Sequence, residues 1–146
     1  MRVEHDASGF LNEAQRRSLS AIIAALEKAL FDFEGWASGQ ERQGRVYQEV
    51  NDLTPSQREA LHHYVARLRE SIADAVLTFR LEPQVREVRA SIRGRAAILW
   101  EGVADTEPRR LERYGPVHPD AESLLSPRTS ALIAILEKIL SLVGQT

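Results

Sequence analysis

The chain of 146 residues contains no cysteine, which excludes a disulfide scaffold, a thiolate metal site and a cysteine nucleophile. Lysine is scarce as well: only Lys28 and Lys138 occur among 19 basic residues, and the others are arginines. The longest apolar runs, residues 21–26 and 131–136, are far shorter than the roughly 20 residues of a membrane span. The N-terminal residues lack the apolar stretch of a signal peptide. We therefore expect a cytoplasmic chain with no membrane segment.

Motifs for catalysis and cofactors are also scarce. The sequence has no glycine-rich phosphate loop, no GxSxG turn and no HExxH pair. It predicts no cofactor, no metal site and no catalytic residue. A formal net charge of -2 argues against a dedicated polyanion binder, which is usually strongly basic.

Helical periodicity fills most of the chain, and no segment alternates with period two. The apolar spacing predicts helices over about residues 12–33, 55–79, 83–104 and 126–143. Capping signals support three of the starts: Asn12 with Gln15, Thr54-Pro55 with Gln57, and Ser126-Pro127. Leu68 and Ile72 are expected on the central apolar stripe of the second helix.

Four amphipathic helices of this length predict an all-α fold, a four-helix bundle or a close relative, in a single domain over residues 1–146. Two long connections, residues 34–53 and 105–125, join the helices, and the first has room for a helical turn at 46–50. Long loops in compact domains are often functional.

The fourth helix has an unusually wide apolar arc of about 180°, whereas one core face uses about 100–120°. Its segment from Ser130 to Leu140 is identical to Ser20 to Leu30 at eight of eleven positions. Two good helix formers can converge on such a match, or both helices can present similar faces in a pseudo-symmetric or dimeric core. The excess arc predicts an interaction surface and a homodimer. Its residues are Leu132, Ile133, Ile135, Leu140 and Leu142.

Arginines provide a second candidate. A stripe on the third helix and the loop that follows it could bind an anion, a nucleic acid or an acidic partner. The stripe consists of Arg86, Arg89, Arg93 and Trp100, and the loop contributes Arg109, Arg110, Arg113, Tyr114 and His118. Within this loop, Tyr114-Gly115-Pro116 is typical of a helix stop with the aromatic ring packed back on the bundle.

Three functions follow from these patterns, in order of preference. The first is a small non-catalytic interaction or scaffold module that self-associates and binds a protein partner that the sequence does not name. The second is nucleic-acid or anionic-ligand binding through the arginines. The third is an RNA-cleaving enzyme, because Arg58 and His63 resemble the Arg-x4-6-His motif of HEPN ribonucleases. Chance alone accounts for such a pair in a chain this rich in arginine, so this function ranks last.

Overall fold

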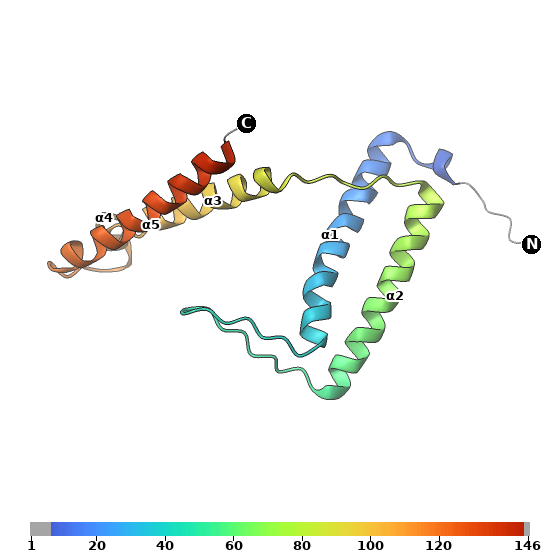
Figure 1. Cartoon of the computed structure of the whole chain (residues 1–146), viewed down its shortest axis with the longest axis horizontal. Coiled ribbons are helices and arrows are strands. Elements are labelled where there is room, and N and C mark those ends of the chain that lie inside the picture. Colours follow the sequence, from blue (N-terminus) through green and yellow to red (C-terminus); the bar gives the residue numbers. More distant parts are fainter. Residues whose placement is uncertain (1–6, 145–146) are drawn as a thin grey trace, which may run out of the picture. The chain divides into compact units, whose positions relative to one another are not determined.

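The computed structural model describes residues 7–144, and these are helical apart from their connections (Figure 1). The helices are α1 (Glu13–Ala37), α2 (Pro55–Phe79), α3 (Val88–Ala104), α4 (Pro108–Leu111) and α5 (Ala121–Gly144), with 3-10 turns η1 (Ser8–Phe10) and η2 (Glu112–Tyr114). The described residues contain no strand, and only an isolated bridge joins Gln43 and Gln48. The predicted all-α class is confirmed.

Two compact units make up the chain, Met1–Gln84 and Val85–Thr146. In the first unit α1 packs against α2, and in the second α3 packs against α5. The single domain expected over residues 1–146 stays a prediction.

No helix within residues 7–144 combines the length and the apolar character needed to cross a bilayer. The cytoplasmic location expected from the sequence stays a prediction.

Capping boxes start both helices of the first unit, as the sequence predicts. The side chain of Asn12 accepts a hydrogen bond from the backbone N–H of Gln15, and the Gln15 side chain accepts one from the N–H of Asn12. Thr54 and Gln57 form the same reciprocal pair in front of α2. Each box satisfies two backbone donors that the first helical turn leaves unpaired.

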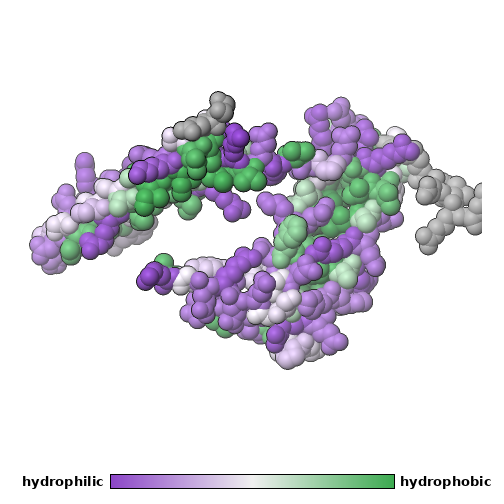
Figure 2. All heavy atoms as spheres, in the orientation of Figure 1, coloured by the Kyte–Doolittle hydropathy of each residue, from purple (hydrophilic) through white to green (hydrophobic). Residues whose placement is uncertain are grey.

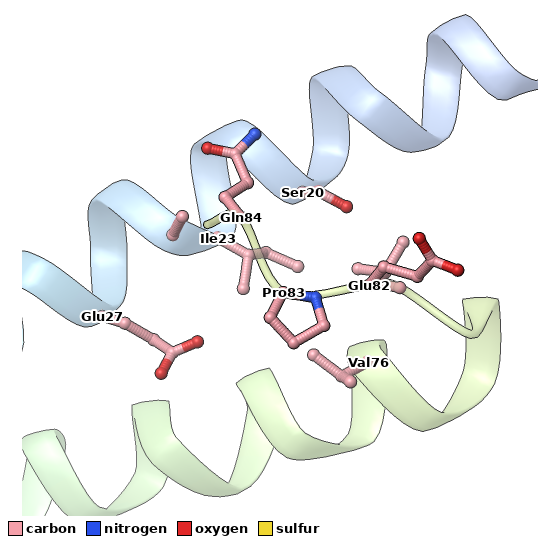
Figure 3. Close-up of a pocket in the computed structure, with 9 residues that line it drawn as sticks. Ser20, Ile23, Glu27, Val76, Glu82, Pro83 and Gln84 are labelled. Atoms are coloured by element: carbon pink, nitrogen blue, oxygen red, sulfur yellow. The ribbon is translucent and has the colours of Figure 1, made fainter. Parts of the chain in front are cut away.

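The core of the first unit lies along the line where α1 and α2 meet. Five buried aliphatic side chains form it: Ile23, Leu30, Val65, Ile72 and Leu81. The last of these follows α2, because the chain takes a left-handed conformation at Arg80 (φ 49°) and turns back toward α1. Pro83 and Gln84 then line a groove against Ser20 and Ile23, as Figure 3 shows. The segment after α2 thus covers one side of the helix pair.

Two predicted helix starts differ from the structure. The third helix begins at Val88 instead of residue 83, because Leu81 is buried in the first unit and residues 81–87 form a non-helical connection. The last helix begins at Ala121, so Pro127 lies inside it instead of at its start. Proline lacks only one backbone donor there, and the residues before it form helix readily.

The second unit has a small buried centre. Ala96 of α3 and Thr129 and Val143 of α5 are its buried residues. The Thr129 hydroxyl donates to helix carbonyls of the preceding turn, at 3.3 Å from the oxygen of Leu125 and 3.2 Å from that of Ser126. Few large side chains are therefore buried between α3 and α5.

Ile72 and Leu68 differ in burial, although the sequence placed both on the central stripe. Ile72 is 9% exposed and belongs to the core, whereas Leu68 is 36% exposed at its edge. We therefore expect Ile72→Ala to cost about 2–5 kcal/mol of unfolding free energy, and Leu68→Ala less than half as much. Urea denaturation followed by circular dichroism measures both values. Equal losses would contradict this placement of the core.

Candidate interaction surfaces

Antiparallel packing of α3 and α5 is fixed by contacts near both ends of the pair. The guanidinium of Arg93 donates to the carbonyl oxygen of Val143 at 3.1 Å, near the start of α3 and the end of α5. Further along, the indole N–H of Trp100 donates to Glu137 at 3.4 Å. Residue numbers rise on α3 as they fall on α5, so the two helices run in opposite directions (Figure 1).

Large apolar side chains remain exposed on α5. Leu132, Ile135 and Leu142 are 53%, 56% and 68% exposed. Their spacing of three and seven residues places them on one stripe of the helix. The other two predicted interaction residues, Ile133 and Leu140, are half-buried.

A matching stripe lies on α3. Val88, Ile92 and Leu99 follow each other at intervals of four and seven residues and are exposed. Both stripes are displaced in the same rotational sense from the buried residues Ala96 and Thr129, by about 40–80° on α3 and about 60–140° on α5 at 100° per residue. In an antiparallel pair this places them on the same face of the pair.

We call this surface the α3–α5 apolar face. Figure 2 shows a band of apolar residues along this helix pair. The face consists of Val88, Ile92, Leu99, Leu132, Ile135 and Leu142.

Three of the four residues of the predicted arginine stripe lie on α3, within about 40° of one another: Arg89, Arg93 and Trp100. Arg86 precedes the start of α3 and therefore lies in the connection, whereas Arg89 and Arg93 lie on the helix. Arg93 is engaged by the last turn of α5, where a cation also interacts favourably with the helix dipole. Trp100 is half-buried and bonds across the pair.

The loop after α3 also differs from the expectation. Tyr114 is 76% exposed, so it does not pack back to close the end of a bundle, and the Arg113 guanidinium lies 5.0 Å from its ring centre. Gly115 has φ 141°, which only glycine adopts readily, so the predicted stop at this position is confirmed.

Polar side chains of the same loop bind locally. Arg110 of α4 pairs with Asp105 at 2.8 Å, and Arg109 is exposed beside it. The ring nitrogen Nδ1 of His118 accepts a hydrogen bond from the backbone N–H of Asp120 at 3.1 Å. Arg93 and Trp100 of the predicted stripe contact α5 instead of this loop.

Arg58 and His63 both lie on α2, and their role as a ribonuclease pair stays a prediction. They are five residues apart on α2, about 140° around the helix. Arg58 lies against Gly39, where a Cβ atom would come within 2.8 Å of its Nη1, and Gly39 has φ 87°. His63 is exposed and lies beside Tyr64, with ring centres 5.9 Å apart and ring planes tilted by 57°. Arg58 therefore helps to join the end of α1 to the start of α2.

The connection between α1 and α2 contains an ordered hairpin that the sequence did not indicate. The backbone N–H of Gly44 donates to the carbonyl of Tyr47 at 2.7 Å, and the N–H of Glu49 donates to the carbonyl of Arg42 at 2.9 Å. The hairpin replaces the helical turn expected at 46–50.

Glu49 is the centre of a polar network that holds this hairpin to α1. Its Oε1 accepts from the indole N–H of Trp36 and from the backbone N–H of Arg42, both at 3.0 Å, and its Oε2 accepts from the hydroxyl of Tyr47 at 2.6 Å. The Arg42 guanidinium lies 5.7 Å from the Trp36 ring centre and pairs with Asp32 at 2.6 Å. The hydrogen bonds from Tyr47 and Trp36 lower the pKa of Glu49, and the bond to Glu49 raises the pKa of Tyr47.

Beside the network lies a recess of about 450 Å³, which we call the loop recess. Its apolar wall comes from Phe33, Trp36, Leu53 and Leu61, and its charged residues are Glu49 and Asp52. Asn51 fixes the loop backbone at its edge by donating to the carbonyls of Trp36 at 2.8 Å and Gln40 at 3.2 Å.

Comparison with protein-family models, curated proteins and solved structures finds no match for this chain. The role of each site residue is therefore inferred from its own contacts, burial and charge.

Protonation of Glu49 tests the network. Because its pKa is lowered in the folded chain, Glu49 stabilises the hairpin above its ordinary pKa of 4.5, and this contribution is lost as the pH falls through the folded value. We expect the Trp36 indole N–H resonance to titrate with a midpoint below 4.5 and the shift to vanish in Glu49→Gln. NMR on a Trp100→Phe background, where Trp36 is the only indole, measures it. A midpoint at or above the ordinary value would contradict the network.

Proposed function

We propose that this chain is a small protein-interaction module that self-associates through the α3–α5 apolar face. The observation that carries the proposal is the exposure of six large apolar side chains on one face of an ordered helix pair. Soluble proteins usually cover apolar patches of several hundred Å². A partner surface would remove this area from water, which is the main driving force of protein association.

A second copy of the chain suits this face. Two antiparallel helix pairs that meet through their apolar faces form a four-helix arrangement, in which each helix buries two sides instead of one. A two-fold axis would place the α3–α5 apolar face of one copy against the same face of the other copy. Two-fold dimers are the commonest oligomers. The wide apolar arc of α5 would then be buried on both sides, by α3 and by the second copy.

Contacts of the arginines favour this function over anion binding. Arg93 already binds a helix carbonyl, and Arg110 and Arg113 bind or stack on neighbours in their own loop. Each guanidinium thus already uses one N–H donor or its flat face on a neighbour in its own unit. Nucleic-acid binding is therefore the second candidate and is tested by its steep dependence on salt concentration.

Ile135→Glu tests the proposed dimer. The side chain is 56% exposed, so the variant should fold, but a carboxylate at the centre of the face would have to be desolvated on association. We expect the parent chain to sediment at twice 16.4 kDa and the variant at 16.4 kDa, both at micromolar concentration.

Ser130→Glu is the matched control. Ser130 is exposed on the same helix but lies on the opposite side from the apolar stripe, so the variant should remain a dimer. Circular dichroism checks that both variants are helical. A parent chain that sediments as a monomer, or equal masses for all three proteins, would refute self-association through this face.

A further inference from the structure

The two sides of the α1–α2 pair differ in character. One side carries the ion pair of Glu34 with Arg69 at 2.7 Å, and the segment that contains Pro83 crosses it (Figure 3). The other side carries exposed apolar residues. We call it the α1–α2 apolar face: Ile22, Leu26 and Phe33 of α1, and Tyr64 and Leu68 of α2.

Helical spacing shows that these residues share one side. Ile22, Leu26 and Phe33 fall within about 40° on α1, and Leu61, Tyr64 and Leu68 within about 60° on α2. Phe33 and Leu61 both line the loop recess, so the two stripes lie on the side where the recess opens. The line between the two stripes, which we call the groove, ends at the loop recess.

The dimensions of the groove fit a helix. From Ile22 to Phe33 it extends about 17 Å at 1.5 Å per residue, or about three helical turns. Amphipathic helices bind such grooves with apolar anchors on one side, and a large anchor enters the deepest pocket. Phe33, Trp36, Leu53 and Leu61 supply the wall for that anchor.

The charge of the residues that line the loop recess indicates which kind of partner helix would bind there. The charged side chains that line the recess, Glu49 and Asp52, are both acidic. Glu49 is committed to the hairpin network, whereas the Asp52 carboxylate is exposed at the rim and makes no hydrogen bond or ion pair within residues 7–144. A cation beside the anchor would pair with Asp52 at the edge of an apolar site.

We propose that the α1–α2 apolar face and the loop recess bind a basic amphipathic helix of a partner protein, with a large apolar side chain in the recess and a lysine or arginine next to Asp52. This site lies in the first unit, and the proposed dimer face lies in the second. The chain would thus self-associate with one helix pair and capture its partner with the other.

Titration of model peptides tests this site on the full-length chain. The probe is a helical peptide of about 16 residues made of leucine and lysine with one central phenylalanine, and its companion has glutamate in place of lysine. On a Trp100→Phe background, fluorescence of Trp36 reports directly on the recess. We expect the lysine peptide to bind and shift the Trp36 emission, and the glutamate peptide to bind at least about tenfold more weakly.

Variants locate the bound peptide. Ile22→Lys places a cation in the groove and Asp52→Lys reverses the charge at the rim, so each variant should bind the lysine peptide about tenfold or more weakly. Phe31→Lys is the matched control, because Phe31 is 69% exposed on the other side of α1 and lines no part of the loop recess. This control should bind the lysine peptide with the affinity of the parent chain.

Several results would overturn the proposal. These are no binding of the lysine peptide, equal affinity for parent and Ile22→Lys, or tighter binding of a peptide that spans residues 126–144 of this chain, which would assign the groove to the chain itself. Repeating the titration on Ile135→Glu separates the two proposals, because peptide binding should persist whether or not that variant dimerises.

Discussion

An antiparallel pair of helices has only one line of contact, and this constraint governs both units of the chain. Side chains on that line are buried, as Leu30 and Val65 are in the first unit and Ala96 and Val143 in the second. An apolar side chain displaced by half a helical turn reaches no neighbour within its own pair. The apolar arc of α5 is about twice as wide as one contact line can cover. Exposed apolar faces follow directly from this excess.

Polar contacts determine which side of each pair stays open. In the first unit, the pair of Glu34 with Arg69 and the returning segment around Pro83 occupy one side. In the second, Arg93 and Trp100 bond across to α5 on one side and leave the side of Leu99 and Leu132 bare. Each unit therefore presents one apolar and one polar side.

Local signals in the sequence predicted local structure well. The capping boxes at Asn12 and Thr54 depend on residues three positions apart, so the starts of α1 and α2 were correct. The start of α3 depends on Leu81, which the first unit buries, and this long-range contact has no local signal. Ser126-Pro127 has the appearance of a start, but favourable residues before it extend α5 by one and a half turns.

The sites show the same division. The wide apolar arc of α5 is visible in the sequence, but which half faces α3 depends on the partner helix, so Ile133 and Leu140 turned inward while Ile135 stayed exposed. Leu68 and Ile72 differ by only about 40° on a helix, and the position of α1 decides between them. The network of Trp36 with Glu49 joins residues thirteen positions apart in a connection without periodicity, so sequence patterns could not reveal it.

Intermolecular contacts of the α5 methyl groups test the central claim most directly. Two samples of the chain, one isotope-labelled and one unlabelled, are mixed, and isotope-filtered NMR detects nuclear Overhauser effects between different copies. The account predicts intermolecular signals among the methyl groups of Leu132, Ile135, Leu142 and Leu99. Signals confined to single chains, with these methyl groups exposed to solvent, would contradict it.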